Sequence, residues 1–440
     1  MPSLDPSRYV YSLAGTLLAG EWTAAGIKDS LRRPPVDRRL RAPKFTERVL
    51  GAFPARPAFK SLVGFLRKDA GLARALARAP IPAASFSRHK PRMDAPPSRL
   101  VGITLPDLPT EAALAKWFGV GPQHLRWRAD VTGRNRKHPP GPLRTYRYRW
   151  MKKRDGAARL LEIPKATLKQ MQRKILVEIL GVLPVHPSAH GFCTGRSIAT
   201  NALPHCGKSI VLRLDLADFF PSVTSARVFR IFRTLGYPID VARPLMGLCT
   251  TSVPADIWEA RPGAQAGAEF ARRQRLITRH LPQGAPTSPA LANLAAHRLD
   301  RRLAALAMEI GATYTRYADD LAFSGAAELA RSRKRVATLV AVIADDEGFA
   351  LNHRKTRIMR AGTRQRVAGV IVNVRPNIAR ADFDRLKAVL VNCARHGPTS
   401  QNREHVPDFR AHLSGKIAHV RSINLHRGDK LLTLFKKIAW

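Results

Sequence analysis

The sequence predicts an α+β fold, in which a β-rich central region lies between two mainly helical ends. Apolar residues recur at three-to-four spacing through residues 1–79 and again after Val374, which is the period of an amphipathic helix. Between these regions, β-prone runs at residues 212–217 and 313–324 carry aspartates. The pattern therefore indicates a central sheet with acidic side chains, preceded and followed in the chain by helical domains.

Residues 1–100 are predicted to form a basic helical extension that ends in a linker. Many arginines lie on the face opposite the apolar residues, and prolines are frequent from residue 79 to residue 98. Residues 101–145 are predicted to form a helical lead-in, where Thr110 can cap the helix that follows it. These patterns assign no function to the extension beyond that of a basic helical module.

Two adjacent acids form the most informative feature of the central region. Asp319 and Asp320 lie between two β-prone runs, which predicts a hairpin with both carboxylates at its tip. Like charges side by side repel each other, so a fold that holds them together usually has a cation to offset them. A solvated acidic turn is the alternative for any such pair, and we expect Asp345 and Asp346, in a polar stretch that ends a helix, to be a solvated pair of this kind.

Asp215 is a third acid that distinguishes the hairpin from an ordinary turn. It ends an apolar β-type run, and the aromatic residues and the proline that follow stop the strand. Three carboxylates on adjacent strands would form an oxygen-rich site that suits Mg²⁺. Two such ions can activate an attacking hydroxyl and stabilise a leaving phosphate oxygen. This chemistry suggests phosphoryl or nucleotidyl transfer.

Several segments in order resemble the motifs of the reverse transcriptases. They are residues 159–165 (RLLEIPK), 190–197 (HGFCTGRS), 215–220 (DLADFF), 281–289 (LPQGAPTSP) and 317–320 (YADD). Cys193 departs from the family pattern, which usually has arginine there. The resemblance implies a right-hand polymerase fold around an antiparallel sheet, with fingers and palm at residues 146–375 and a helical thumb at residues 376–440.

Two shorter matches resemble the bacterial retron enzymes in particular. Residues 201–205 (NALPH) fit the retron pattern NAxxH, and residues 367–369 (VAG) stand where retron enzymes usually have Val-Thr-Gly. Ala368 lacks the threonine hydroxyl, so any hydrogen bond that this hydroxyl makes is in doubt here. The resemblance implies DNA synthesis on a cognate structured non-coding RNA. It also implies priming from a guanosine 2′-OH, a branched RNA–DNA product (msDNA) and a role in antiphage defence with an effector protein.

The resemblance further implies chemical roles for the acids and for one lysine. Asp215, Asp319 and Asp320 are expected to hold two Mg²⁺ ions, for which Mn²⁺ can substitute, and the backbone carbonyl of Leu216 is expected to help. A primer hydroxyl would attack the α-phosphate of a dNTP at this site. Lys355, beyond the hairpin, is expected to protonate the leaving pyrophosphate.

A further group of residues is expected to bind the incoming nucleotide. The ring of Phe220 would clash with a ribose 2′-OH and so favour deoxynucleotides, with a packed core aromatic as the alternative. Gly284 lets the backbone approach a nucleotide closely, and Gln283 can contact its sugar or base. Lys152 and Arg159 are either cations that close over the triphosphate or solvated surface charges.

Resemblance to the retron enzymes also indicates an RNA-contacting group: Arg196, Asn201, His205, Val367, Ala368 and Gly369. The composition favours a nucleic-acid partner, because 75 lysines and arginines outnumber 32 acidic residues and give a net charge of +43. These basic residues are dispersed along the chain, which suggests a broad basic channel. The expected partners are the cognate RNA, its DNA product, dNTPs and a retron effector protein.

The cysteines and the hydropathy predict a cytoplasmic protein without a membrane partner. The chain has 4 cysteines, and they form neither a CxxC pair nor a zinc-like spacing with histidine. Such residues are expected to be free thiols in a reducing compartment. No apolar run approaches the roughly 20 residues that a membrane span needs.

Two other functions fit parts of the pattern. A group II intron-like reverse transcriptase shares the central motifs, but the chain after Val374 has room for a thumb and not for a DNA-binding and endonuclease region. A catalytically silent RNA-binding scaffold would keep the basic charge, but the three acids and Gln283 are intact. Metal-dependent nucleotide incorporation separates the scaffold from an enzyme.

Overall fold

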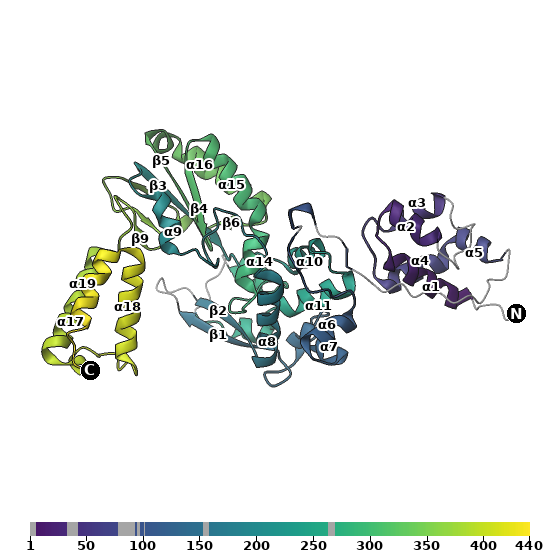
Figure 1. Cartoon of the computed structure of the whole chain (residues 1–440), viewed down its shortest axis with the longest axis horizontal. Coiled ribbons are helices and arrows are strands. Elements are labelled where there is room, and N and C mark those ends of the chain that lie inside the picture. The colour runs from purple at the N-terminus through teal and green to yellow at the C-terminus, as the bar shows by residue number, and fades with distance from the viewer. Residues whose placement is uncertain are drawn as a thin grey trace. The chain divides into compact units, whose positions relative to one another are not determined.

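The computed structural model describes residues 6–32, 43–77, 93–94, 97–100, 102–152, 158–262 and 269–440. The chain forms two compact units, one made of Met1–Leu183 and Thr224–Ser288 and the other of Pro184–Val223 and Pro289–Trp440. Most of the proline-rich linker expected at residues 79–98 lies outside the described residues. Figure 1 traces the elements in chain order.

The N-terminal helices of the first unit pack around a core of their own. They are α1 (Pro6–Ala19), α2 (Ala24–Arg32), α3 (Pro43–Ala52), α4 (Phe59–Lys68) and α5 (Ala70–Ala77). Apolar residues at helical spacing place side chains such as Leu13, Ile27 and Leu62 in this core. The helical pattern predicted for this region is therefore confirmed for the described residues.

Two short helices, α6 (Glu111–Phe118) and α7 (Pro122–Ala129), form the lead-in. The Thr110 hydroxyl caps α6 by accepting a hydrogen bond from the N–H of Ala113 at 3.0 Å. This satisfies one of the free amides at the start of the helix. The cap that the sequence predicts at Thr110 is confirmed.

An antiparallel hairpin of β1 (Tyr146–Lys152) and β2 (Ala158–Pro164) follows the lead-in. Tyr146 lies opposite Pro164 and Lys152 opposite Ala158, while the tip at residues 153–157 lies outside the described residues. Further helices complete this unit: α8 (Ala166–Ile175), a π-helical turn (Leu176–Leu180), α10 (Ser225–Thr234), α11 (Ile239–Cys249), α12 (Ala255–Glu259) and α13 (Glu269–Ile277).

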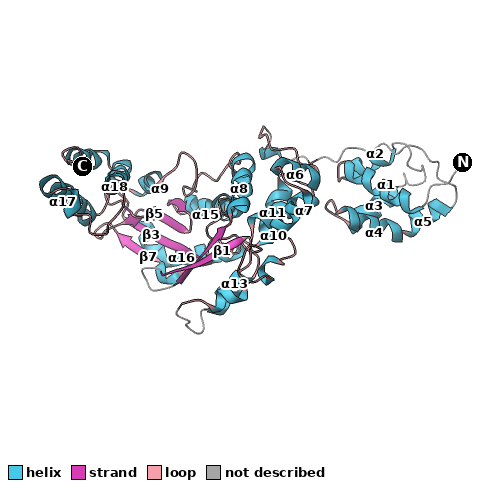
Figure 2. Ribbon diagram, turned by 90° about the horizontal axis from the view of Figure 1, so that it is seen from below, coloured by secondary structure: helices cyan, strands magenta, loops and turns pink. Residues whose placement is uncertain are grey.

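The second unit is built on an antiparallel sheet with the strand order β4-β5-β3-β6. The central strand β3 (Ile210–Ala217) pairs with β5 (Asp320–Gly325) along one edge. Along its other edge, β3 pairs with β6 (Ala350–Leu351) and β7 (Arg357–Arg360). Figure 2 shows β5, β3 and β7 side by side. Strand β4 (Thr313–Tyr317) forms a hairpin with β5.

Helices cover the sheet of the second unit. Helix α16 (Ala327–Asp346) packs on β3 and β5, and α15 (His297–Glu309) packs on β4 (Figure 1). Two shorter helices, α9 (Ile198–Ala202) and α14 (Ser288–Ala295), lie earlier in the chain. Nearly every residue of β3 is buried, which explains the continuous apolar run of that strand in the sequence.

Three helices end the chain: α17 (Arg380–His396), α18 (Phe409–Ile423) and α19 (Leu425–Phe435). Leu390, Leu413 and Leu431 are among the buried residues of their shared core. The helical pattern predicted after Val374 is thus confirmed. The remaining elements are short: β8 (Arg366–Val367), β9 (Val370–Ile371) and single 3-10 turns at Ser98–Leu100, Asn135–Lys137, Leu203–His205, His353–Lys355 and Pro398–Ser400.

Cys193, Cys206, Cys249 and Cys393 are free thiols, as expected. Among the described residues, no helix combines the length and the apolar character that crossing a bilayer requires.

Candidate active site

The strand register of the second unit brings the three predicted acids together. Asp215, near the end of β3, lies opposite Asp320, the first residue of β5. The N–H of Leu216 donates to the backbone oxygen of Asp319 at 2.9 Å, which continues the pairing into the turn. Tyr317 pairs with Asp320, so only Ala318 and Asp319 separate the two strands of the hairpin. The hairpin with acids at its tip is confirmed.

Two cations lie against these carboxylates. Lys355 Nζ is 3.0 Å from Asp215 Oδ2, and the Asp215 side chain is only 5% exposed. Arg213, two residues before Asp215 on the same strand, holds its Nε 3.6 Å from Asp320 Oδ1. The N–H of Asn352 donates to the backbone oxygen of Asp215 at 2.7 Å, which ties the segment before Lys355 to β3. The structure therefore brings Lys355 to the acids, where the sequence predicted it.

The electrostatics of the site favour a bound cation. The pKa of Asp320 is raised to about 6, mainly by burial; Arg213 opposes this rise, and the Asp319 and Asp215 carboxylates add to it. Burial also raises the pKa of Asp215, against the hydrogen bond from Lys355. A bound cation would stabilise the ionised carboxylates and so lower both pKa values. The site is therefore expected to bind a positively charged ligand.

The donor set suits a hard divalent ion such as Mg²⁺, because it consists of carboxylate oxygens with backbone carbonyls nearby. The described part of the chain contains no ready-made cluster of three or more His, Cys, Asp or Glu side chains at metal-binding distances. Lys355 and Arg213 instead hold two of the three carboxylates through ion pairs. Metal binding would require these side chains to yield part of their contacts.

The two phenylalanines after Asp215 have different surroundings. Phe219 is 4% exposed and stacks on Phe349 at a centroid distance of 5.7 Å, so it is a core residue. Phe220 is only partly buried and contacts the ring of Phe192 at 6.1 Å. Phe192 is itself 50% exposed. The structure thus leaves Phe220, and not Phe219, at the edge of the core.

His205 does not lie where a nucleic acid could reach it, which corrects the expected RNA contact. Its ring is fully buried, with Nδ1 2.6 Å from Ser324 Oγ and Nε2 2.8 Å from Thr315 Oγ1. Burial lowers the pKa of His205 to about 4, so the ring is neutral at physiological pH. Asn201 is likewise 1% exposed. The His205 ring therefore joins the turn after α9 to β4 and β5, and the backbone oxygen of Asn201 accepts a hydrogen bond from Thr315 Oγ1 at 3.3 Å.

The triplet from Val367 to Gly369 forms a tight turn between β8 and β9. Val367 is buried in a core cluster, while Ala368 and Gly369 have φ values of 45° and 89°. Two consecutive positive φ angles are typical of a two-residue type I′ hairpin loop. The exposed Gly369 is also bonded through its carbonyl to Arg366 Nε at 3.0 Å. The turn itself accounts for part of this motif without any RNA contact.

Arg196 directs one guanidinium nitrogen toward its own loop. Its Nη1 donates to the backbone oxygens of His186 at 2.8 Å and Pro187 at 3.1 Å, and also to that of Ala189. The side chain therefore holds the segment before His190 in place.

The predicted nucleotide-binding residues Gln283 and Gly284 belong to the first unit. The N–H of Gln283 donates to Glu162 Oε2 at 3.0 Å, and the N–H of Glu162 donates to the backbone oxygen of Gln283 at 3.0 Å. Gly284 has a φ of 137°, and a Cβ there would lie 2.9 Å from the Glu162 backbone oxygen. His280 Nε2 lies 3.2 Å from Glu162 Oε1, and both side chains are fully buried. Lys152 and Arg159 are exposed at either side of the hairpin tip.

Sequence reasoning missed the Glu162–His280 pair. Glu162 follows an apolar residue within a matched motif, but nothing in the pattern shows that it is buried or that its partner lies far along the chain. A charged residue inside a β-prone run, on the same strand face as the apolar Leu160 and Pro164, is the signal that could have revealed it.

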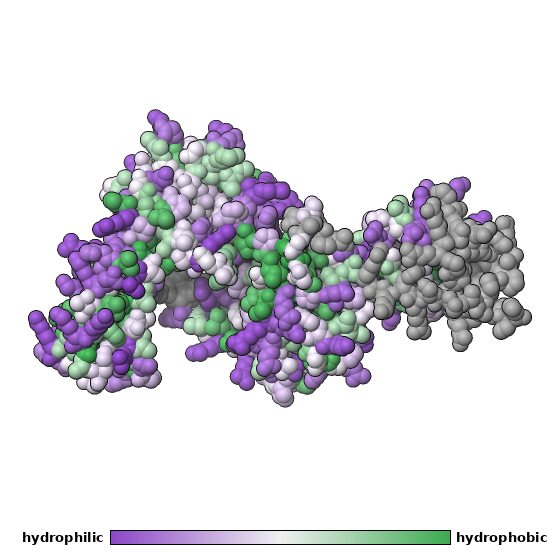
Figure 3. All heavy atoms as spheres, in the orientation of Figure 1, coloured by the Kyte–Doolittle hydropathy of each residue, from purple (hydrophilic) through white to green (hydrophobic). Residues whose placement is uncertain are grey.

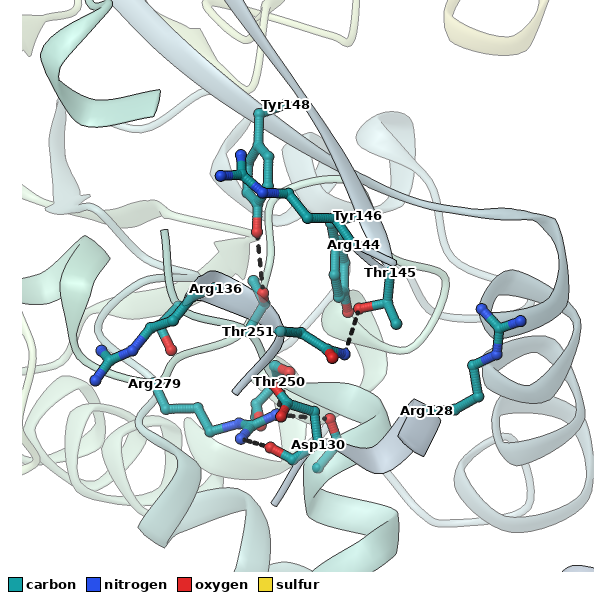
Figure 4. Close-up of a pocket in the computed structure, with 13 residues that line it drawn as sticks. Arg128, Asp130, Arg136, Arg144, Thr145, Tyr146, Tyr148, Thr250, Thr251 and Arg279 are labelled. Carbon is teal, nitrogen blue, oxygen red and sulfur yellow. Dashed lines mark hydrogen bonds between the residues drawn. The ribbon is translucent and has the colours of Figure 1, made fainter. Parts of the chain in front are cut away.

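An arginine-rich pocket also lies in the first unit (Figure 4). Arg279 directs its guanidinium to Thr250 Oγ1 at 2.9 Å and to several backbone oxygens, among them that of Asp130. Arg144 makes a bidentate pair with Asp256 at 2.8 Å. Both guanidinium groups are therefore bonded to the protein itself. Residues of the lead-in, the hairpin and α11 line the pocket together.

Comparison with known proteins agrees with this geometry. The family model described as reverse transcriptase (RNA-dependent DNA polymerase) matches residues 151–395, more than half of the chain. The retron Mx65 reverse transcriptase of Myxococcus xanthus is 42% identical over 341 residues, which are 76% of this chain and 73% of that protein.

Two further relatives carry similar names. The retron Mx162 reverse transcriptase of Myxococcus xanthus is 41% identical over 63% of this chain and 55% of its own length. The retron Ec86 reverse transcriptase of Escherichia coli is 31% identical over 67% of this chain and 81% of its own length. The chain therefore belongs to the reverse transcriptase family, as an RNA-directed DNA polymerase, and within it to the bacterial retron reverse transcriptases.

Proposed function

We propose that the protein copies a cognate structured RNA into a branched RNA–DNA (msDNA) by Mg²⁺-dependent nucleotidyl transfer, as the polymerase of a retron. The observation that carries this proposal is the register of β3 and β5, which sets Asp215 opposite Asp320 with Lys355 3.0 Å from Asp215. The raised pKa values of the buried Asp215, paired with Lys355, and of the partly exposed Asp320, paired with Arg213, support nucleotidyl transfer more than a structural ion pair.

In this proposal, Asp215, Asp319 and Asp320 hold two Mg²⁺ ions with help from the Leu216 carbonyl, and Mn²⁺ can substitute. When bound, such ions supply Lewis acidity to the attacking hydroxyl and to the leaving phosphate oxygen. Lys355 moves from Asp215 to the leaving pyrophosphate and gives it a proton.

Other residues would select the nucleotide. The partly exposed ring of Phe220 restricts the space for a ribose 2′-OH. Gln283 and Gly284 contact the nucleotide from a loop that Glu162 holds by two hydrogen bonds. The Glu162 carboxylate accepts from the N–H of Gln283, and the Glu162 N–H donates to the Gln283 backbone oxygen. The exposed Lys152 and Arg159 approach the triphosphate.

The C-terminal helices are proposed to lie on the nucleic-acid duplex as a thumb. Figure 3 shows hydrophilic residues over much of the visible face of α17, α18 and α19. Exposed basic residues in this region include Lys387, Arg395, Arg403, Arg410, Lys416, Arg421, Lys430, Lys436 and Lys437. Contacts of this kind release counterions, so binding of the template should weaken steeply as salt rises. Arg196 and the turn at Ala368 and Gly369 remain candidates for further RNA contacts.

The biological setting follows from the retron proposal alone. The template would be a non-coding RNA encoded beside the gene, with priming from an internal guanosine 2′-OH. The product would act in antiphage defence with an effector protein, in the cytoplasm.

The test is to isolate the nucleic acid that co-purifies with the protein expressed from its native locus. The proposal predicts small single-stranded DNA joined to RNA through a bond that debranching enzyme cuts. An Asp319→Ala, Asp320→Ala double variant should lack this DNA, while an Asp345→Ala, Asp346→Ala variant, matched in charge, should keep it. Unbranched DNA would contradict the retron product, and a discrete RNA without DNA in every variant would favour the silent scaffold.

A further inference from the structure

We propose that Arg316 is a positioning residue for reverse transcription, because it fixes the turn that carries Asp319 and Asp320. The inference rests on the proposed catalytic role of those two acids. Arg316 lies on β4, one residue before Tyr317, and its side chain is 0% exposed. It is the largest side chain among the fully buried residues that the structure describes.

The guanidinium of Arg316 is bonded on three sides. Its Nε donates to Asp300 Oδ1 at 2.7 Å and its Nη2 donates to Asp300 Oδ2 at 2.6 Å, which is a bidentate pair with a carboxylate that is also 0% exposed. Its Nη1 donates to Asn293 Oδ1 and to the backbone oxygen of Ala318, both at 3.0 Å.

Charge compensation explains only part of this arrangement. A buried guanidinium needs a carboxylate, and Asp300 supplies it. Nη1 carries two N–H groups, and Asn293 satisfies one of them. The bond from the other to the Ala318 oxygen adds nothing to neutralisation, but it joins the buried pair to the catalytic turn.

The turn needs such support because its backbone is strained. Ala318 has a φ of 57°, in the left-handed region that a residue with a Cβ rarely adopts. This conformation sets the direction in which Asp319 leaves the hairpin. A hydrogen bond to the carbonyl of the strained residue holds that direction from inside the protein.

A second segment supports the turn from its other side. A Cβ at Gly191 would lie 2.5 Å from the Ala318 nitrogen, so the two backbones are in direct contact. Asn293 Nδ2 donates to the Gly191 oxygen at 2.9 Å. The Asn293 side chain therefore bonds both to the Arg316 guanidinium and to Gly191, which packs against the turn.

Arg316 also contacts the segment that follows the third acid. Its Cζ lies 5.5 Å from the centroid of the Phe219 ring, four residues after Asp215. The same guanidinium thus touches both chain segments that carry the acids. This double contact distinguishes it from an ordinary core ion pair.

Tyr314 supplies the matched control. Its hydroxyl donates to Asp300 Oδ1 at 2.8 Å from the same strand, in the same buried network. Tyr314→Phe removes a buried hydrogen bond beside Arg316 but leaves the bond to Ala318 intact. A merely structural role would make the two positions equivalent in their effect on activity.

The experiment measures single-nucleotide extension of an RNA-templated primer and the melting temperature of full-length variants. Arg316→Lys keeps a positive charge beside Asp300, but one ammonium cannot reach Asp300, Asn293 and the Ala318 oxygen together. We expect kcat to fall about 10- to 100-fold, as for a small displacement of catalytic groups. KM for dNTP and affinity for the primer–template should stay within about threefold, because neither ligand touches Arg316. Tyr314→Phe should lower the melting temperature with kcat within about threefold of wild type.

A wild-type kcat in Arg316→Lys would overturn the proposal. The proposal would also fail if Tyr314→Phe and Arg316→Lys lost the same stability and the same fraction of kcat. If Arg316→Lys fails to fold, Gly191→Ala tests the same turn without altering buried charge. Its methyl group would push on the Ala318 nitrogen, and kcat should fall while KM stays constant. Asp319→Ala separates the two proposals: retained activity there overturns the assigned site, whereas its loss beside an active Arg316→Lys overturns only the positioning role.

Discussion

Replacing His205 by alanine should destabilise the second unit because the buried His205 ring forms hydrogen bonds to two strands of that unit. Each ring nitrogen makes one hydrogen bond, to Ser324 at 2.6 Å and to Thr315 at 2.8 Å. Losing both costs about 2 kcal/mol, and the cavity left by the ring costs about 2 kcal/mol more. After the substitution, Thr315 Oγ1 keeps its second hydrogen bond, to the backbone oxygen of Asn201 at 3.3 Å. The Ser324 hydroxyl loses the hydrogen bond that it makes with the His205 ring.

The total of about 4 kcal/mol corresponds to a fall of about 8–16 °C in melting temperature for a unit of this size. Thermal unfolding followed by circular dichroism measures it, with RNA affinity measured on the same variant at a temperature where it is folded. An unchanged melting temperature together with a large loss of RNA affinity would refute the buried role and restore the RNA contact.

The same residue gives a pH dependence whose sign is fixed. Its folded-state pKa of about 4 lies below the ordinary value of 6.5, so the unfolded chain takes up a proton at this site first. The stability that His205 contributes is therefore present above pH 6.5 and is lost as the pH falls through about 4. The loss approaches about 3 kcal/mol. The stability difference between wild type and His205→Gln should shrink by that amount from pH 7.5 to pH 4, and a constant difference would contradict the assignment.

Three further changes test the nucleotide site. Lys355→Ala should lower kcat about 100-fold with little change in KM for dNTP, since a general acid acts in the chemical step; an unchanged rate constant for extension in a single-turnover assay would contradict this. Gly284→Ala should raise KM for dNTP, because its Cβ would lie 2.9 Å from the Glu162 oxygen at a φ of 137°; steady-state kinetics with wild-type KM would refute that reasoning. Phe220→Ala should reduce the preference for dNTP over rNTP at least about tenfold, and an unchanged ratio of kcat/KM would mean that the ring is only a packing residue.

The three acids of the proposed active site could be predicted from the sequence because local patterns indicate the strands that carry them. The β-prone runs around Asp319 and Asp320 predict a hairpin, and the apolar run before Asp215 predicts a buried strand. Antiparallel pairing of neighbouring strands then leaves few ways to bring the acids together. Lys355 was predicted to act at the site from the resemblance to the reverse transcriptases, and it lies beside Asp215.

The supporting residues could not be predicted in the same way. The roles of Arg316 and Asp300 depend on burial and on partners from different elements, and both look like ordinary surface charges in the sequence. Glu162 and His280 form a buried pair although β2 and the loop after α13 are far apart in the chain. His205 shows the opposite error, because its resemblance to a retron motif gave no indication that its ring is enclosed.

The most direct test of the central claim is Mg²⁺-dependent incorporation of dNTPs on an RNA template by wild type, Asp215→Asn and Asp345→Asn. Asp345 is an exposed acid in α16, so its variant controls for the loss of one negative charge. The account predicts incorporation by wild type and Asp345→Asn, none by Asp215→Asn, and none by any of them after chelation of the metal. Incorporation by Asp215→Asn at the wild-type rate would contradict the assignment of the site.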